Sequence, residues 1–192
     1  MKKIYLIIFS MALLSCKSKK AVIIPENINS KYNQEYINSK VSIFGKLTTD
    51  NYSELISKIE SSLNIKIDKS RKIYLNFQQK GKNCIRAGQN SSKINFSKTL
   101  EISKRITSKY NTQRILSYHK NSFFNNQLSS KKIWALDSKD FLNNTVFDLK
   151  ENCQAFLIIK PNGEFYKFYG EDHFSIIEDL LKNENWDSLK NK

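Results

Sequence analysis

Residues 155–169, with the sequence Ala-Phe-Leu-Ile-Ile-Lys-Pro-Asn-Gly-Glu-Phe-Tyr-Lys-Phe-Tyr, decide the fold that we expect for this 192-residue chain. The first five residues form a continuous apolar run, and residues 164–169 alternate in the manner of a strand. Between the two runs, Pro161-Asn162-Gly163 has the composition of a tight turn, because Asn and Gly adopt positive φ at little cost. The segment therefore predicts a β-hairpin with its turn at residues 161–163.

The elements on either side of this hairpin follow from hydrophobic periodicity. After it, Asp172 is a candidate N-cap for a helix that ends near Asn183. Before it, the pattern predicts strands at 41–44, 72–77, 114–118 and 133–136, and helices at 51–63 (capped by Asp50), 92–110 and 138–147 (capped by Asp137 or Ser138). Residues 78–91 are expected to form a loop, and residues 121–128 fit neither pattern. The order β-α-β-α-β-α-β-β-α predicts an α/β domain.

The first sixteen residues have the features of an export signal. A basic start at residues 1–3 precedes an apolar run at residues 4–14, which is too short to span about 30 Å of hydrocarbon as a helix. Cys16 follows Leu13-Leu14-Ser15, and this pattern resembles the lipobox of bacterial lipoproteins, in which the Cys is lipidated and becomes the new N-terminus. An ordinary cleaved signal peptide is the alternative. The resemblance implies a lipid anchor on Cys16, in the cell membrane or outer membrane, and a mature chain that faces the periplasm or the exterior.

Three segments follow from this boundary. Residues 1–15 are the predicted signal peptide, and residues 16–40, rich in Asn, Ser and Lys and without sustained periodicity, are a predicted lipidated tether. Residues 41–192 are the predicted folded domain. The mature length suits one domain, and 40% hydrophobic with 12% aromatic residues is enough for a core.

The mature chain is strongly basic. Without residues 1–15, 30 basic residues remain against 18 acidic ones, a net charge of about +12. Such a charge attracts anionic lipid head groups and polyanions, with an affinity that falls as salt rises. The lysines are scattered singly across every predicted element, which fits a codon bias at least as well as a binding face. No aromatic-interleaved basic motif of an RNA-binding kind is present, so nucleic acid is not an expected partner.

The order of elements over residues 41–183 resembles the thioredoxin fold. Residues 156–163, Phe-Leu-Ile-Ile-Lys-Pro-Asn-Gly, are also similar to the hairpin turn of thioredoxin-like and redoxin families. The resemblance implies a three-layer α/β/α domain with a mixed central sheet, in which residues 72–77 and 114–118 are central strands. These families carry their redox cysteines just after the second strand and before the long helix, and Cys84 occupies that position.

Two features of the thioredoxin-like active site are missing from this sequence. Those oxidoreductases use Cys-x-x-Cys, because two thiols one helical turn apart form a readily exchanged disulfide and the helix N-terminus lowers the pKa of the first thiol. Here residues 83–87 are Asn-Cys-Ile-Arg-Ala, with no second Cys at that spacing. The cis-proline of the family would fall at Cys153 or Gln154, where this chain has no proline.

Cys84 and Cys153 are the cysteines that remain after Cys16, and export would deliver them to an oxidising compartment. The resemblance implies that they approach each other, because the loops that carry them are neighbours in a thioredoxin fold. A disulfide between them would stabilise the domain by about 4 kcal/mol in the chain-entropy model. The alternatives are an exchangeable pair, a Cys84 nucleophile activated by Arg86 and the helix terminus, or two unpaired thiols.

The histidines and the glycine of the first loop show no functional pattern. His119 and His173 form no i, i+4 pair and no zinc-binding spacing with the cysteines, so both are expected at the surface. Lys80-Gly81-Lys82 lacks the following Ser or Thr of a phosphate-binding loop. We therefore expect no metal and no cofactor.

Two acidic clusters also have structural explanations. Trp134 beside Asp137 and Asp140 is expected in the core next to a helix cap, although the three could line a groove. Glu171 and Asp172 are expected to be a charge pair at a helix N-terminus and not a catalytic dyad.

Together these observations predict a membrane-anchored envelope lipoprotein whose thioredoxin-like domain is a non-catalytic binding or structural module. A thiol-disulfide or peroxide-handling enzyme that uses Cys84 and Cys153 is the first alternative, and exposure of either sulfur would favour it. A basic binder of envelope polyanions or of a protein partner is the second alternative. A contiguous lysine patch on the folded surface would favour that function.

Overall fold

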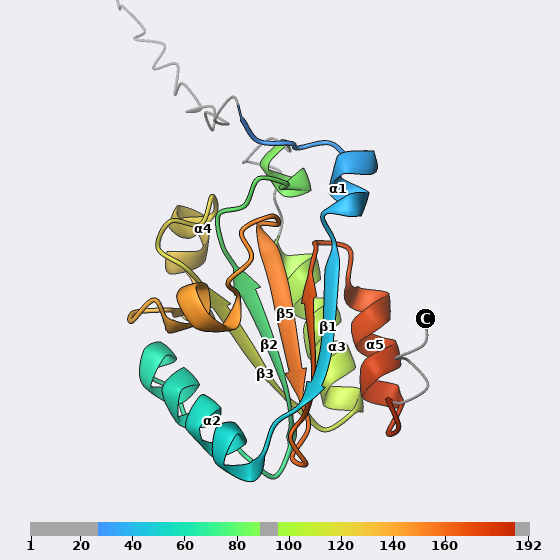
Figure 1. The fold of residues 1–192 in the computed structure, drawn as a ribbon. Helices are drawn as coiled ribbons and strands as arrows, with labels where there is room; N and C mark the ends of the chain where they lie inside the picture. Colours follow the sequence, from blue (N-terminus) through green and yellow to red (C-terminus); the bar gives the residue numbers. More distant parts are fainter. Residues whose placement is uncertain (1–26, 89–95, 187–192) are drawn as a thin grey trace, which may run out of the picture.

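A six-stranded mixed sheet runs through the middle of the molecule (Figure 1). The computed structural model describes residues 27–88 and 96–186. In spatial order the strands are β1 (Val41–Lys46), β6 (Glu164–Tyr169), β5 (Gln154–Ile159), β2 (Lys72–Gln78), β3 (Thr112–Tyr118) and β4 (Ala135–Leu136). β2, β3 and β4 are parallel, whereas β5, β6 and β1 continue the sheet in antiparallel pairs.

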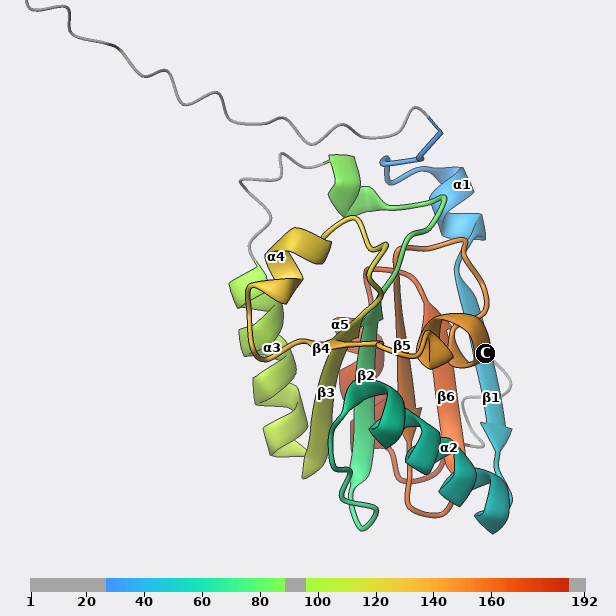
Figure 2. The ribbon, with the colours of Figure 1, turned by 90° about the vertical axis from the view of Figure 1, so that its left-hand side faces the viewer.

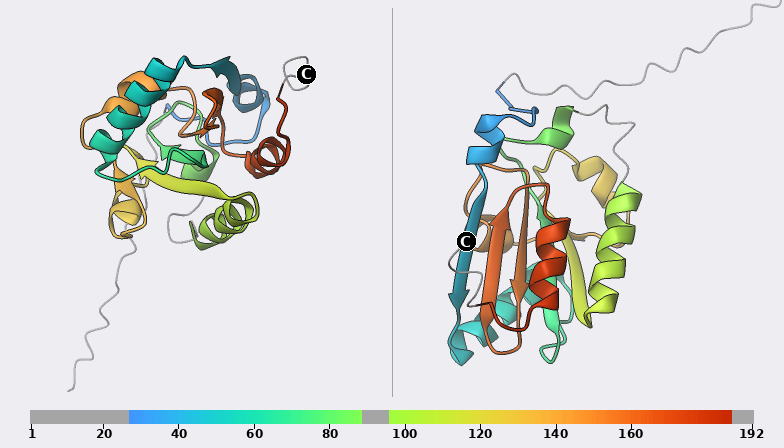
Figure 3. Two further views of the ribbon diagram at one scale, coloured as in Figure 1. Left: turned by 90° about the horizontal axis from the view of Figure 1, so that it is seen from below. Right: turned by 90° about the vertical axis from the view of Figure 1, so that its right-hand side faces the viewer.

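Helices cover both faces of this sheet, so the domain has three layers (Figures 2 and 3). α2 (Thr49–Leu63) and the π-helical turn η3 (Leu142–Val146) cover one face, and α3 (Phe96–Lys109) and α5 (Phe174–Lys182) cover the other. The described residues also form three short helices: α1 (Gln34–Asn38), η1 (Ile85–Gly88) and α4 (Asn125–Ser129). This architecture confirms the predicted α/β/α fold class with a mixed central sheet.

The hairpin predicted at residues 155–169 is confirmed. β5 and β6 pair from Ala155 with Tyr169 to Ile159 with Phe165, and the amide of Gly163 donates to the carbonyl of Lys160 over 3.0 Å. Gly163 has φ of +84°, and a Cβ there would lie 2.6 Å from the carbonyl oxygen of Leu47. The turn therefore requires glycine for both its conformation and its close approach to the chain after β1.

The core lies on both faces of β2 and β5. Alternate side chains of β2 separate into two clusters, with Leu75 facing α2 and Tyr74 facing α3 and α5. Phe156 at the centre of β5 is fully buried, and its ring lies 5.2–6.0 Å from the rings of Tyr74, Tyr166, Phe168 and His173. Burial on both faces explains why the sequence of β5 is a continuous apolar run.

Several elements begin or end at residues other than those predicted. The N-cap of α2 is Thr48 and not Asp50, because the Thr48 hydroxyl accepts a hydrogen bond from the Asn51 amide over 3.2 Å. The helix predicted at 138–147 is reduced to η3, and Asp140 before it has φ of +56°, outside the helical region. Of the strand predicted at 133–136, only the last two residues form a strand. α4 occupies the end of the stretch that fitted neither pattern. Residues 89–95, which include the start of the helix predicted at 92–110, lie outside the described residues.

The segment before β1 is packed against the domain and does not form a free tether. We call residues 27–40 the N-terminal strap. It contains α1, and Tyr36 within it is fully buried. The sequence pattern predicted that the folded domain starts at Val41. The structure shows that it begins earlier in the chain. The predicted signal peptide, Cys16 and the tether residues up to 26 lie outside the described residues. Every helix of the described residues falls short of the length and apolar character that a membrane span requires.

Candidate functional site

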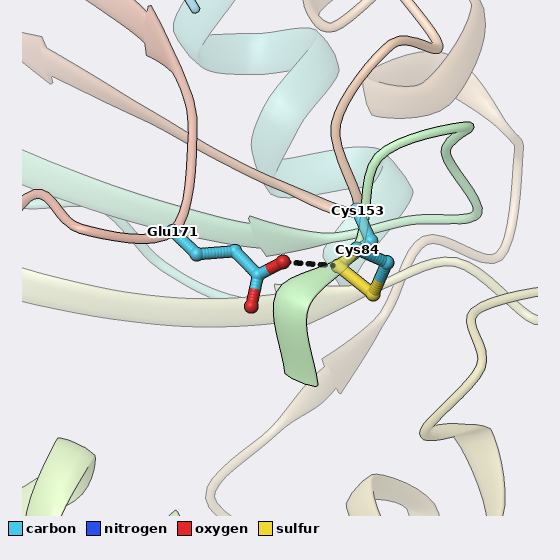
Figure 4. A group of neighbouring side chains, drawn as sticks. All are labelled: Cys84, Cys153 and Glu171. Carbon is cyan, nitrogen blue, oxygen red and sulfur yellow. Dashed lines mark hydrogen bonds between the residues drawn. A yellow bond between two sulfur atoms is a disulfide. The ribbon is translucent and has the colours of Figure 1, made fainter. Parts of the chain in front are cut away.

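Cys84 and Cys153 form a disulfide at the end of the sheet where β2 ends and β5 begins (Figure 4). Their Cα atoms are 5.2 Å apart, within the range that a disulfide requires. Both residues have an exposed fraction of 0%. The fold therefore brings the two cysteine loops together, as the thioredoxin resemblance implied, and places the sulfurs in the interior.

Backbone contacts hold the two cysteine loops side by side. The amide of Cys153 donates to the carbonyl of Asn83 over 3.1 Å, and the amide of Gln79 donates to the carbonyl of Cys153 over 2.9 Å. A Cβ at Gly81 would lie 2.4 Å from the carbonyl carbon of Asn152, so only glycine allows this approach. The glycine of the Lys80-Gly81-Lys82 segment thus serves the packing of the loop against its neighbour.

The carboxyl group of Glu171 lies against the disulfide (Figure 4). Its Oε1 is 3.1 Å from Sγ of Cys153 and accepts the backbone amide of Ile85 (2.6 Å), and its Oε2 accepts the amide of Arg86 (3.1 Å). Burial raises the pKa of Glu171, although Arg86 and the two amides act in the opposite direction. A disulfide sulfur carries no proton, so Cys153 donates no hydrogen bond at this contact.

This position corrects the sequence-based expectation for Glu171 and Asp172. α5 begins at Phe174, so neither residue caps it. Glu171 turns inward to the disulfide, and Asp172 accepts hydrogen bonds from Tyr36 (2.9 Å) and Lys40 (2.5 Å). Burial alone would raise the pKa of Asp172, but these two hydrogen bonds lower it overall. The two acids therefore fasten two different segments to the start of α5.

Arg86, the predicted activator of a Cys84 nucleophile, is directed to Glu171. Its Nε lies 3.6 Å from Glu171 Oε2, and its guanidinium carbon lies 5.8 Å from the centre of the Phe96 ring. In the disulfide, Cys84 has no thiolate for Arg86 to stabilise. The structure thus assembles Cys84, Cys153 and Arg86 in one place and adds Glu171, which the sequence did not indicate.

The N-terminal strap lies over this cluster. The amide of Cys84 donates to the carbonyl of Asn29 (2.8 Å), and the amide of Asn29 donates to the carbonyl of Lys82 (2.9 Å). Further along the strap, the hydroxyl of Tyr36 accepts the amide of Glu171 over 2.8 Å. Two points of the strap are therefore bonded directly to the segments that carry Cys84 and Glu171.

A buried polar layer lies in the sheet next to this site. Gln78 of β2 and Gln154 of β5 are directly opposite each other, and Asn76 and His173 lie beside them with exposed fractions of 0%. Nδ1 of His173 lies 3.0 Å from the carbonyl of Gly170, so it carries the proton, and Nε2 accepts from the amide groups of Asn76 (3.4 Å) and Gln154 (3.3 Å). Burial lowers the pKa of His173 to about 4.

Both histidines are buried, which corrects the prediction that they lie at the surface. His119 follows β3 with an exposed fraction of 6%, and its Nε2 donates to Oδ1 of Asp140 over 3.1 Å because its Nδ1 accepts the amide of Asn121. Trp134 is buried in the cluster that contains both cysteines, which confirms its expected place in the core. Asp137 is also buried and accepts hydrogen bonds from Ser62 and Asn143.

The outer side of α3 carries a shallow groove of about 570 Å³. Three of its side chains are cationic and one is acidic; the lining consists of Lys98, Glu101, Ile102, Lys104, Arg105 and Ser108. This excess of positive charge suits an anionic ligand, although an isolated helix face attracts ions only weakly in salt.

The donor atoms of Cys84, Cys153 and Glu171 lie within 4.8 Å of one another, and these residues are the described chain's one group of potential metal ligands. In the disulfide form neither sulfur has the thiolate charge that binds a metal. The arrangement as it stands stabilises the junction of three segments and offers no exposed reactive atom.

No protein-family model matches the chain, and no curated protein matches it significantly in sequence.

The burial of His173 predicts that the protein loses stability in acid. In the unfolded chain His173 takes up a proton as the pH falls through about 6.5, whereas in the folded protein it stays neutral down to about 4. The unfolded state therefore binds more protons in this window, and the free energy of unfolding should fall by about 3 kcal/mol from this residue alone. Urea unfolding between pH 7 and 4 measures the slope. A His173→Asn variant should show a shallower slope, and an unchanged slope would contradict the assignment.

The strap contacts predict that Tyr36 protects the disulfide from reductants. Tyr36→Ala removes a buried ring and the hydroxyl that joins Glu171 to Asp172, so the strap should detach more often. Reduction by dithiothreitol should become at least about tenfold faster, because losing a buried aromatic costs about 3–5 kcal/mol and 1.4 kcal/mol is a factor of ten. Alkylation of the released thiols and mass spectrometry give the rate. Tyr32→Ala, in the same segment but 61% exposed, is the control and should react like the wild type. Equal rates in both variants would show that the strap does not limit access.

Proposed function

We propose that this protein is a lipid-anchored lipoprotein of the bacterial cell envelope whose thioredoxin-like domain is a non-catalytic binding or structural module. The observation that supports the non-catalytic part most strongly is the complete burial of both sulfurs, each with an exposed fraction of 0%. Thiol-disulfide exchange requires a thiolate to attack a disulfide sulfur, and its rate depends on access to that sulfur. A sulfur that the strap and Glu171 cover offers no such access.

A structural role for the disulfide agrees with its position. Cys84 and Cys153 are 69 positions apart, so the bridge removes a large share of the freedom of the unfolded chain. The chain-entropy model gives about 4 kcal/mol for such a loop, a large part of the stability of an ordinary domain. The bridge also secures the end of the sheet where β2 and β5, the two most buried strands, meet their loops.

The location is supported by the residues around Cys16. A Leu three residues before the Cys and Ser15 immediately before it match the lipobox pattern, and the preceding apolar run is too short to remain as a membrane-spanning helix. Two or three acyl chains on one residue hold a protein on a membrane in an essentially permanent way.

The binding surface that we favour for the module is the groove on α3. Lys98, Lys104 and Arg105 outnumber the single acid in its lining, and the whole mature chain has a net charge of about +12. An envelope polyanion or an acidic face of a protein partner has the complementary charge.

Lipidation is tested by a Cys16→Ser variant in a host that processes bacterial lipoproteins. The wild-type protein should incorporate radiolabelled palmitate and fractionate with membranes, whereas Cys16→Ser should do neither, because the acyl chains have no attachment point. A wild-type protein that takes up no label and remains in the soluble fraction would contradict the anchoring.

The non-catalytic role is tested by insulin reduction with dithiothreitol as the electron donor. The wild-type protein should not accelerate the reaction above the background rate, because neither sulfur is accessible. A Cys84→Ser/Cys153→Ser variant serves as the matched control and should give the same rate. Turnover in the wild type that disappears in Cys84→Ser would instead make the thiol-disulfide enzyme the better proposal.

A further inference from the structure

The exposed large apolar side chains of the described residues occur in two pairs. Tyr32 (61% exposed) and Ile37 (42%) lie on the strap, which leads into β1 at one edge of the sheet. Ile133 (47%) and Leu136 (40%) lie next to or within β4 at the opposite edge. Single exposed apolar residues are common on soluble proteins, so the position of each pair decides its meaning.

Contacts of the strap with the rest of the domain fix the positions of Tyr32 and Ile37. Tyr36 between them is buried, and Lys40 and the Tyr36 hydroxyl are both bonded to Asp172. The ring of Tyr32 lies 5.4 Å from that of Tyr36, and its hydroxyl lies 3.4 Å from Asp172. Tyr32 and Ile37 are therefore presented to solvent by a segment that cannot turn them inward without breaking these contacts.

The distance along the chain from Cys16 places the strap next to the membrane. Ten residues, 17–26, separate Cys16 from Asn27, and a chain of this length reaches at most about 40 Å when fully extended. The chain enters the domain at the end that carries the strap, α1 and η1 (Figure 1). This end of the domain is therefore the end nearest to a lipid anchor on Cys16.

We propose that the strap rests on the surface of the membrane in which Cys16 is anchored, with Tyr32 and Ile37 inserted in the interfacial region. This inference depends on the proposed lipid anchoring. Tyr is suited to that region, because its ring is apolar and its hydroxyl remains hydrated, and interfacial segments typically enter by about 5–10 Å.

The charges near the strap agree with this placement on anionic lipid. Lys17, Lys19 and Lys20 lie next to the anchor in the sequence, and Lys31 is exposed beside Tyr32. Glu35 is the exposed acid of α1 and acts against them. Because the anchor makes the contact intramolecular, a weak interaction of Tyr32 and Ile37 is sufficient to orient the domain.

The test uses an environment-sensitive fluorophore on a single introduced cysteine of the full-length, lipidated protein. Ile37→Cys reports on the strap, and Ile133→Cys, similarly exposed at the other edge of the sheet, is the matched control. The only free thiol is the introduced one when Cys16 is acylated and Cys84 is bonded to Cys153. The proteins are reconstituted in vesicles of phosphatidylethanolamine and phosphatidylglycerol, and quenching is measured with lipids that carry a spin label at a shallow acyl position.

We expect a blue-shifted and strongly quenched probe at position 37, and a probe at position 133 that emits as in water. Equal, water-like emission from both positions in a protein that floats with the vesicles would overturn the inference while leaving the anchoring intact. A protein that does not float would contradict the anchoring instead. In that case the mature chain with a hexahistidine tag in place of Cys16, held on nickel-chelating lipids, gives the same readout and still decides whether the strap contacts the membrane.

Discussion

The covalent link between Cys84 and Cys153 determines the arrangement of one whole end of this domain. It fixes the loop after β2 to the loop before β5, and these loops in turn hold the segments around them. Isolated bridges join Asn29 to Asn83 and Asn83 to Asn152, so three segments that are distant in the sequence run side by side next to the disulfide. Glu171, shortly before α5, contacts both cysteine loops: it accepts the amide of Ile85 and lies against Sγ of Cys153.

This end of the domain is also where polar groups are buried. Gln78, Gln154 and His173 lie in the interior at this end of the domain, and a buried polar group costs free energy unless it is hydrogen-bonded. His173 satisfies both ring nitrogens by remaining neutral, and Glu171 satisfies its carboxyl with two backbone amides and a sulfur contact. The covalent link keeps this polar region assembled where apolar packing alone would provide less stabilisation.

The predictable part of the fold is the part that local patterns determine. The hairpin at residues 155–169 and the amphipathic helix α2 were predicted within a few residues, because turn chemistry and periodicity act over short distances. The central strands β2 and β3 were predicted for the same reason. The short strand β4 and the turn η3 were predicted poorly, since each depends on contacts with other elements and has little pattern of its own.

The site was only half predictable for the same physical reason. The pairing of Cys84 with Cys153 was expected from a family resemblance, whereas Glu171, His173 and Tyr36 reach the site through contacts over 18 to 135 positions of sequence. No spacing rule covers such distances. One local signal was available for Glu171: the apolar face of the last helix begins at Phe174, which leaves Glu171 too far upstream to cap it.

The pairing order of the strands has a consequence for how the chain assembles. Within the described residues, β1 pairs with β6 alone, and β2 completes its antiparallel side with β5. The strap likewise depends on Asp172 and on the loop around Asn83. The first strand to be synthesised therefore has no strand to pair with until β6 follows, and the early segments remain without their partners until residues 154–172 are present. Such a chain closes into its final fold only after residues 154–172 have joined its early segments.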